Sequence, residues 1–581
     1  MPLGLRSAST PLVDIRHARV IVKYKTDGAL MREGALSARD PDRVVVQHAD
    51  RMSQRLGIAL RDGRMIAPRT QVLRASDMSS AALVARLQAD PDVEYAEVDE
   101  RVYIAAAPND PRYAGGQPPS ITPTVGQWYL RAPDTTIVSA INAEAAWNTT
   151  KGSPAIVVAD LDTGVRPDHP DLVGKLVPGY DFVSADADGS FTSSNDGSGR
   201  DTDASDPGDW VTQAESDNGP LQGCLVGDSS WHGTQTAALI GAATDNGVGM
   251  ASVGRNVRVM PVRVLGKCGG FMSDVVAGMY WAAGINIPST FGTGPANPFP
   301  AKVLNMSLGS ATTTCGTTYQ TAVSAVNSAG ASVVISAGND AGLAVGQPAN
   351  CAGAIGVGGL RQIGTKVGFS DVGPQISISA PAGNCVNTLQ SDPCLYPILT
   401  ATNTGTTTPA TNTFSDSFNI SVGTSFSAPL VSGTAALMLS VNPTLTPSQV
   451  RSMLQATARA FPTTGGTAGT VACVPPTTTQ QRECYCTTGT CGAGMLDAHA
   501  AVSAVPAPSA AQALAFATPV APVPGDTVTL DGSTSVPASG KTISTYQWTM
   551  VNNGGIAALG ATTNAATATV TTNGGGTFTV R

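Results

Sequence analysis

Short apolar runs alternate with longer helical patterns between Gln127 and about Val505. Such alternation predicts an α/β fold in which helices cross over between the strands of a parallel sheet. The runs that read as buried strands are Ile156–Ala159, Val257–Val262, Val303–Met306 and Val333–Ile335. Polar turn residues follow each run, and open α/β sheets bind their ligands beyond the carboxyl ends of the strands. We therefore expect the functional site at that edge of the sheet.

A charged, arginine-rich and cysteine-free segment precedes this region and extends to about residue 107. Its apolar run Val20–Val22 reads as a strand, and the run from Ser79 to Ala89 reads as a helix. The stretch Val93–Val98 alternates as a strand does, so the segment is predicted to be a small separate α+β domain. The small-residue tract Ala105–Ala107 that follows is compatible with an accessible cleavage site and equally with a plain linker.

The last part of the chain has a third pattern. Alanine and proline dominate after Val505, which is typical of a stiff linker. Alternating runs with glycine-rich turns then predict a small β-sandwich, which is partial because its last run reaches the final residue. These runs are Asp526–Leu530, Tyr546–Trp548, Thr567–Val570 and Thr577–Arg581. We therefore divide the chain into residues 1–107, 108–505, 506–524 and 525–581.

Composition supports a globular protein of several domains. The 581 residues are 42% hydrophobic and 13% charged, with 63 glycines and 40 prolines, which indicates a large core and many loops. The net charge of −8 argues against nucleic acid as a partner. We find no uninterrupted apolar stretch of membrane-spanning length and expect no membrane span. The first six residues lack the features of a signal peptide, so export has to be inferred from other signals.

All ten cysteines lie after residue 223. Their even number and the close pair Cys385 and Cys394 favour disulfides, and therefore an oxidising compartment. The alternative is a metal site at Cys484–Cys486 with Cys491, although no second ligand pair has zinc-site spacing.

The clearest candidate chemistry lies in the heptapeptide Gly423-Thr424-Ser425-Phe426-Ser427-Ala428-Pro429. A serine in a glycine-led turn at the start of an apolar helix presents its hydroxyl and nearby backbone N–H groups in one direction, which suits a nucleophile. Serine and threonine at this place are also ordinary helix N-caps. The heptapeptide differs from the Gly-x-Ser-x-Gly elbow because Ser427 replaces the second glycine.

Two further residues occupy places that suit catalysis. Asp162 follows a predicted strand, and His232 stands at the head of an apolar helix. Each alone is more typical of a turn or a helix start, but their order with Ser425 matters. The blocks Asp162-Thr163-Gly164 and His232-Gly233-Thr234, together with the heptapeptide, resemble the three catalytic blocks of the subtilisin-like serine proteases. The resemblance covers about residues 127–505.

This resemblance implies a subtilisin-like fold and the activity of a serine endopeptidase. Ser425 would attack the scissile carbonyl, His232 would transfer the proton, and Asp162 would orient the imidazole. Asn339 would complete an oxyanion hole, and an edge segment would pair with extended substrate. The residues expected to line the substrate cleft are Ser307, Leu308, Gly309, Ala337 and Gly338.

The same resemblance implies structural calcium, a cation that needs several oxygen ligands. The residues that resemble parts of the family's tight calcium site are Asp171, Asn246, Val248 and Met250. A second acidic stretch offers carboxylates for another site but is equally compatible with a solvated loop, and its candidates are Asp201, Asp203, Asp206 and Asp209.

Disulfide-rich loops depart from the plain subtilisin pattern. Sequence does not fix the connectivity of cysteines, so the pairings are hypotheses. The hypothesised pairs are Cys224 with Cys268, Cys315 with Cys351, and Cys385 with Cys394.

The whole chain is therefore predicted to be the zymogen of a secreted endopeptidase. Residues 1–107 resemble the family's inhibitory propeptide, which the enzyme removes itself, and residues 525–581 resemble a partial PKD-type immunoglobulin-like module. We expect protein or peptide substrates, the chain's own propeptide as an intramolecular inhibitor, and a monomeric enzyme. Two alternatives stay open. One is a sedolisin-type enzyme, which His232 argues against, and the other is a surface-binding protein with a catalytically silent domain.

Overall fold

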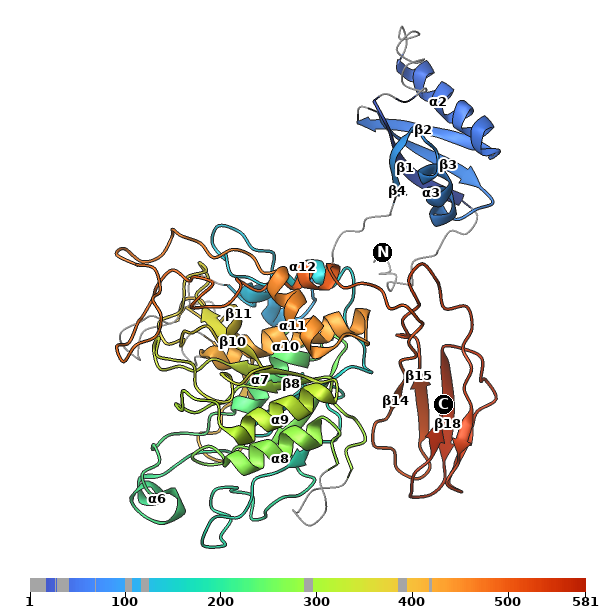
Figure 1. The fold of residues 1–581 in the computed structure, drawn as a ribbon. Coiled ribbons are helices and arrows are strands. Elements are labelled where there is room, and N and C mark those ends of the chain that lie inside the picture. The colour runs from blue at the N-terminus through green and yellow to red at the C-terminus, as the bar shows by residue number, and fades with distance from the viewer. Residues whose placement is uncertain are drawn as a thin grey trace. The chain divides into compact units, whose positions relative to one another are not determined.

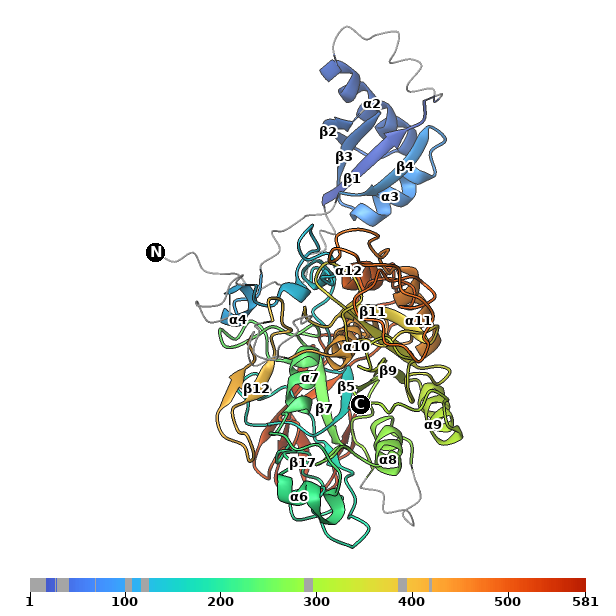
Figure 2. The ribbon, with the colours of Figure 1, turned by 90° about the vertical axis from the view of Figure 1, so that its left-hand side faces the viewer.

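The computed structural model describes residues 17–26, 28, 41–67, 69–99, 107–115, 125–286, 296–384, 394–416 and 421–581. They belong to two compact units, Met1–Ile104 and Ala105–Arg581. Figures 1 and 2 show the ribbon of each unit from two directions.

The first unit is a four-stranded antiparallel sheet of order β2-β3-β1-β4, and its described residues also form two helices. Its elements are β1 (His17–Tyr24), α2 (Pro41–Leu56), β2 (Leu60–Ala67), β3 (Thr70–Ser76), α3 (Ser80–Gln88) and β4 (Val93–Val98). Val20 and Val22 alternate along β1, and Leu83 and Leu87 lie one turn apart on α3, so both elements bury one apolar face in a common core. Ser79 caps α3, since its hydroxyl accepts a hydrogen bond from a backbone N–H. The predicted α+β character is confirmed.

The second unit is built on a seven-stranded parallel sheet of order β11-β10-β9-β8-β5-β7-β6. Its strands are β5 (Val157–Asp162), β6 (Tyr180–Asp181), β7 (Arg258–Arg263), β8 (Val303–Met306), β9 (Ser332–Ser336), β10 (Ile355–Leu360) and β11 (Ile376–Pro381). The four runs predicted as buried strands correspond to β5, β7, β8 and β9, and the predicted α/β fold is confirmed. Because these strands are buried on both faces, their sequences read as continuous apolar runs.

Helices cover both faces of this sheet (Figure 1). Helices α8 (Met272–Ala282) and α9 (Thr317–Ser328) pack on one face, and α7 (His232–Gly241) and α10 (Thr424–Val441) pack on the other. The other described helices of the unit are α4 (Pro111–Gly115), α5 (Ala143–Ala146), α6 (Gln213–Asp217), α11 (Pro447–Ala456) and α12 (Ala498–Ser503). Short 3₁₀ turns occur at Trp128–Leu130 and Gly219–Leu221. Along β5 the side chains alternate between two cores, since Val157, Ala159 and Leu161 pack with α8 and α9 whereas Val158 packs with α7 and α10. Asp162 therefore leaves the strand toward α7 and α10.

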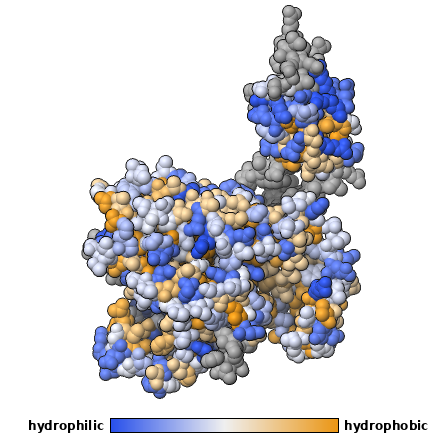
Figure 3. All heavy atoms as spheres, in the orientation of Figure 1, coloured by the Kyte–Doolittle hydropathy of each residue, from blue (hydrophilic) through white to orange (hydrophobic). Residues whose placement is uncertain are grey.

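Helix α10 lies inside the protein, and all its residues from Thr424 to Ser440 are buried. It is the one helix in the described part of the chain that is long and apolar enough to cross a membrane. Its apolar composition is accounted for by this central place in the core. Figure 3 shows hydrophobic residues scattered among hydrophilic ones over the visible face of the unit, as is typical of a protein surface in water.

The C-terminal region of the second unit forms a four-stranded antiparallel sheet, β14-β15-β18-β17, and a separate pair, β16-β19. Their bounds are β14 (Phe516–Thr518), β15 (Thr527–Asp531), β16 (Met550–Asn552), β17 (Ala557–Leu559), β18 (Thr567–Thr572) and β19 (Thr579–Val580). Outside this region, β12 (Ala401–Asn403) and β13 (Asn412–Phe414) form an antiparallel pair near α7. Two predictions fail in detail. Tyr546–Trp548 is not a strand, although Trp548 is buried with Val528 and Val570, and β14 forms within the predicted linker because Phe516 is also buried.

The described cysteines of the second unit are all disulfide-bonded. The hypothesised disulfides Cys224–Cys268 and Cys315–Cys351 are present, and Cys473–Cys484 and Cys486–Cys491 join them. Cys385 lies outside the described residues, although its proposed partner Cys394 is disulfide-bonded.

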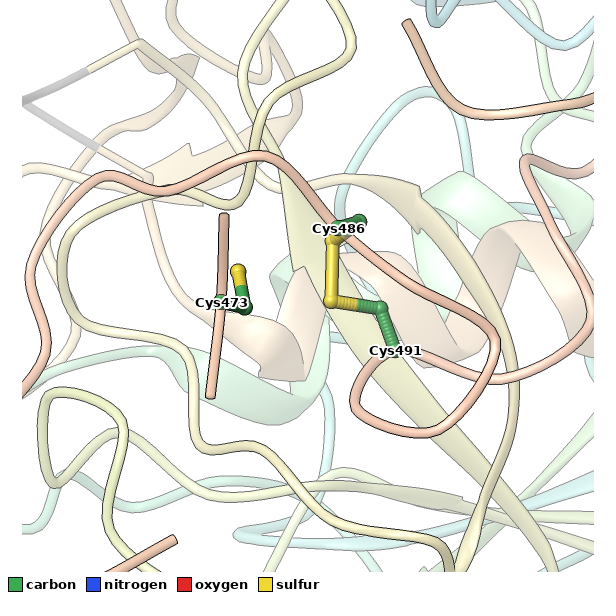
Figure 4. Close-up of side chains that lie close together, drawn as sticks. All are labelled: Cys473, Cys486 and Cys491. Carbon is green, nitrogen blue, oxygen red and sulfur yellow. A yellow bond between two sulfur atoms is a disulfide. The ribbon is translucent and has the colours of Figure 1, made fainter. Parts of the chain in front are cut away.

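The alternative of a cysteine metal site is wrong for the described cysteines. The Sγ atoms of Cys473, Cys486 and Cys491 do lie within 4.8 Å of one another. Figure 4 shows, however, that Cys486 and Cys491 are joined by a disulfide, and Cys473 is bonded to Cys484. A disulfide sulfur is not the thiolate that a zinc ion requires.

Candidate active site

Asp162 and His232 meet at the carboxyl end of β5. The Nδ1 atom of His232 lies 2.8 and 2.9 Å from the two carboxylate oxygens of Asp162. The carboxylate is buried, and it also accepts a 2.8 Å hydrogen bond from the Thr163 N–H. The His232 side chain stays 23% exposed, so its other face is open to a ligand. A fixed Nδ1 contact leaves Nε2 as the nitrogen that exchanges protons.

The charge balance of the site favours a protonated imidazole. Burial by itself lowers the pKa of His232, but the charge and hydrogen bond of Asp162 raise it, and the charges of Asp160 and Asp209 add to that effect. The result is a His232 pKa raised to about 9. A carboxylate that stabilises imidazolium in this way makes the imidazole a stronger base.

Close backbone packing holds His232 in place. A Cβ atom added to Gly233 would lie 2.1 Å from the carbonyl oxygen of Gly164, in the turn after β5. Only glycine permits the start of α7 to approach that turn so closely. Trp231, the residue before His232, is buried with a φ of 54°, and its indole N–H donates a 2.7 Å hydrogen bond to the Gly405 carbonyl.

Ser425 is the second residue of α10. Gly423, with φ 143°, is the N-cap of this helix, and no side-chain cap hydrogen bond is made. The alternative that the serine or threonine here serves as a capping residue is therefore wrong. The Ser425 hydroxyl donates a long 3.3 Å hydrogen bond to the Ser307 carbonyl, and the His232 ring lies 5.6 Å from the ring of Phe426. Within the described residues no hydrogen bond joins Ser425 to His232.

Asn339 follows β9 and is oriented by the start of α10. Its Oδ1 atom accepts hydrogen bonds of 3.0 Å from both the N–H and the hydroxyl of Thr424. This leaves the Nδ2 group as the donor end of the side chain. The residue is exposed, so that group can contact a ligand from solvent.

The expected substrate-cleft residues lie at the ends of β8 and β9. Ser307 is buried, Leu308 is half-buried and Gly309 is exposed, so the segment rises from the core to the surface. Ser307 also donates a 2.7 Å hydrogen bond from its hydroxyl to the Ser425 carbonyl, which ties the segment to α10. Ala337 is buried and Gly338 half-buried beside Asn339.

The first expected calcium site is assembled around Asp171. This buried carboxylate accepts hydrogen bonds from the Met250 N–H at 2.7 Å and from the Asn246 amide at 3.4 Å. Val248 belongs to the same loop and is partly exposed. Burial, together with the charge of Asp110, raises the pKa of Asp171 to about 6.

Asp110 was not predicted, since no motif surrounds it. It is buried, its Oδ2 accepts a 2.9 Å hydrogen bond from the Asp245 N–H, and its Oδ1 has no hydrogen-bond partner among the described residues. Two buried carboxyls close enough to repel, one with an unsatisfied oxygen, are the donor set that a divalent cation accepts. The residues present therefore fit calcium.

The second expected calcium site is not assembled. Asp201 and Asp203 accept backbone hydrogen bonds in their own turns, Asp209 accepts from Ser230, and Asp206 accepts from the Thr163 hydroxyl at 2.7 Å. No three described acidic side chains, these four included, bring their oxygens within 4.8 Å of one another. Asp201 and Asp203 therefore stabilise local turns, whereas Asp206 and Asp209 bind residues distant in sequence, Thr163 and Ser230.

Comparison with known proteins adds an independent observation. Residues 153–487 match the model of the Subtilase family. The chain is 37% identical over 511 residues to an extracellular protease of Xanthomonas campestris, covering 86% of this chain and 74% of that relative. It is 35% identical over 380 residues to an extracellular basic protease of Dichelobacter nodosus, covering 64% of this chain and 56% of the relative. A solved structure of a Pseudoalteromonas arctica protease aligns with a TM-score of 0.55 and 37% identity, covering 69% of this chain and 100% of that one.

Proposed function

Because the chain belongs to the subtilase family, we propose that Asp162, His232 and Ser425 are the catalytic triad with which it cleaves peptide bonds. The chain is a secreted serine endopeptidase that acts on peptide substrates. The observation that carries the residue assignment is the Asp162–His232 hydrogen bond at the carboxyl end of β5, next to the start of α10.

In the proposed mechanism Ser425 Oγ attacks the scissile carbonyl while His232 Nε2 removes its proton. The hydroxyl first rotates away from the Ser307 carbonyl, and since that hydrogen bond is long it offers little resistance. Asp162 keeps the proton on Nδ1 and stabilises the imidazolium that forms. The imidazolium then protonates the leaving amine, and a water molecule, activated by the same nitrogen, hydrolyses the acyl-enzyme.

The negative oxygen of the tetrahedral intermediate needs hydrogen-bond donors. We assign Asn339 Nδ2 and the Ser425 backbone N–H to this oxyanion hole. The assignment is supported by Thr424, which holds Asn339 Oδ1 and so turns the amide nitrogen outward. The segment Ser307–Gly309 is assigned to strand pairing with substrate, with Ala337 and Gly338 on the opposite wall.

We further propose that the protein is made as a self-processed zymogen. Residues 1–107 are assigned as an inhibitory propeptide, which then acts as an intramolecular partner, and residues 108–505 as the catalytic domain. Residues 506–524 and 525–581 are assigned as linker and C-terminal module, and the processed enzyme as a monomer. The separation of Met1–Ile104 as a compact unit supports a removable domain.

Structural calcium is proposed at the Asp171 loop only. Asp171, Asp110 and Asn246 would supply side-chain oxygens to the cation, and Val248 and Met250 would supply backbone carbonyl oxygens. A bound cation would neutralise the two buried carboxyls and so stabilise the loop.

The test is Ser425→Ala compared with Ser427→Ala. Ser427 belongs to the same helix, but its hydroxyl donates to the Ala380 and Pro381 carbonyls in the core. We expect Ser425→Ala to abolish peptide hydrolysis, labelling by a serine-directed phosphonate and cleavage near Ala107, whereas Ser427→Ala retains all three. Undiminished hydrolysis by Ser425→Ala would refute the assignment, and an acidic optimum would favour the sedolisin-type alternative.

A further inference from the structure

A second carboxyl lies directly behind the proposed triad. Asp160 stands two residues before Asp162 on β5, so both side chains leave the strand on the face that packs with α7 and α10. Asp160 is 2% exposed, and in the described part of the chain no lysine or arginine forms an ion pair with it. A buried carboxyl without a cationic partner is costly unless hydrogen bonds from its neighbours satisfy its oxygens.

On one side Asp160 contacts the helix that carries His232. Its Oδ2 accepts a 2.7 Å hydrogen bond from the Thr236 hydroxyl. The same hydroxyl oxygen lies 3.2 Å from the His232 carbonyl oxygen and 3.5 Å from Asp162 Oδ2. Thr236 therefore connects Asp160 with the Asp162–His232 pair.

On the other side Asp160 contacts β8, and β8 is in turn bonded to α10, the helix that carries Ser425. Its Oδ1 accepts a 2.8 Å hydrogen bond from the Asn305 amide on β8, and that amide lies 3.1 Å from Ser307 Oγ. Ser307 donates in turn to the Ser425 carbonyl at 2.7 Å. Asn305 is also fixed to α10 directly, because its Oδ1 accepts a 2.9 Å hydrogen bond from Ser432.

We propose that Asp160 is a positioning residue for the reaction, whose carboxyl joins the helix bearing His232 to the strand and helix that hold Ser425. One of its oxygens binds Thr236 on α7 and the other binds Asn305 on β8, so the carboxyl sets the distance between His232 and Ser425. Asp160 touches neither substrate nor Ser425 Oγ. The inference rests on the proposed function of Asp162, His232 and Ser425.

Asp160 also carries a titratable charge into the site. The charged or titratable groups that face it are Asp162 on its own strand and His232 on α7, whereas Thr236, Asn305 and Ser432 are neutral. Burial and the charge of Asp162 raise the pKa of Asp160 to about 8. Once Asp160 loses its proton, a second negative charge stabilises the His232 imidazolium and makes the imidazole harder to deprotonate.

The experiment compares Asp160→Asn, Thr236→Val and the double variant with the wild type. Asp160→Asn keeps the size and polarity of the side chain, and Thr236→Val removes only the hydroxyl link. We expect each single variant to lower kcat roughly 10-fold or more with little change in KM, because base and nucleophile lose their alignment. The double variant should be no slower than the slower single variant, since both changes break one connection. In Asp160→Asn the acid limb of kcat/KM should move to lower pH by roughly half a unit.

Asp274→Asn is the matched control. Asp274 is a buried carboxyl on α8, on the other side of the sheet, where it pairs with Arg200 and Ser184. Its replacement should lower the unfolding temperature without moving kcat or the pH profile.

Two results would overturn the proposal. One is a variant Asp160→Asn with wild-type kcat and an unmoved acid limb, and the other is a double variant whose losses add fully. If Asp160→Asn does not fold, wild-type kcat in a folded Thr236→Val variant overturns it equally. An inactive Ser425→Ala beside a fully active Asp160→Asn refutes the positioning role alone, whereas an active Ser425→Ala refutes the proposed function.

Discussion

The disulfide Cys224–Cys268 ties the segment that leads into His232 to the loop after β7. The same two segments are also joined by Lys267, whose ammonium is 2.7 Å from Glu215 and 3.9 Å from the ring centroid of Trp210. We predict that removal of this disulfide costs more stability than removal of Cys486–Cys491, although both are single covalent bonds in the same unit.

The difference follows from the lengths of the closed loops. The two cysteines are 44 residues apart in the first disulfide and 5 apart in the second. In the chain-entropy model, loop closure over 44 residues removes about 13 cal/mol/K from the unfolded state, which is about 4 kcal/mol at 25 °C, and closure over 5 residues is worth about 2 kcal/mol. We therefore expect a difference of about 2 kcal/mol between the two paired Cys→Ser variants.

The assay is urea unfolding, with each pair replaced in a Ser425→Ala background so that self-digestion is prevented. The midpoint and the slope both have to be measured, because a changed slope would mean that the compactness of the unfolded state had changed. Equal losses, or a larger loss for the Cys486–Cys491 pair, would refute the loop-closure reasoning and point to native packing as the source of stability.

Three further outcomes are expected. Asn339→Leu should lower kcat by about 100- to 1000-fold with little change in KM, measured by steady-state peptide hydrolysis, because a transition-state donor is lost. The kcat/KM of the wild type should rise with pH up to the raised His232 pKa of about 9, because only the neutral imidazole accepts the Ser425 proton, and a profile flat above pH 6 would contradict this. In the presence of calcium, Gly249→Ala should unfold at a much lower temperature than Gly247→Ala. The unfolding temperature of Gly249→Ala should be the same in calcium and in EDTA. Both glycines have positive φ, but an added Cβ lies 2.0 Å from Asp171 Oδ2 at Gly249 and meets nothing within 4 Å at Gly247.

The sequence predicts best those elements in which all residues have the same kind of surroundings. Val303–Met306 is recognised as a strand with the bounds of β8, because a strand buried on both faces is apolar throughout. Tyr546–Trp548 misleads because an exposed glutamine between two aromatic residues gives the alternation of a strand, although the backbone there belongs to no strand.

The residues of the site also differ in how well the sequence predicts them. Asp162, His232 and Ser425 are recognisable because each lies in a short motif with its own glycine. Asp110 has no such motif, and it contacts residues far away in the sequence, such as Asp245, which is 135 residues from it. Asp160 is hidden for a different reason, since a single aspartate in an apolar strand gives no sign of the two neighbours that its oxygens bind.

The burial of α10 has a practical consequence for anyone who engineers this protein. Since the proposed nucleophile begins a helix enclosed by the main core, a serine-directed probe can label only molecules in which that core is assembled. The labelled fraction then counts folded molecules, and a library screened for labelling is screened for folding at the same time. Variants selected for new specificity in such a screen would therefore already be selected for correct folding, without a separate thermal assay.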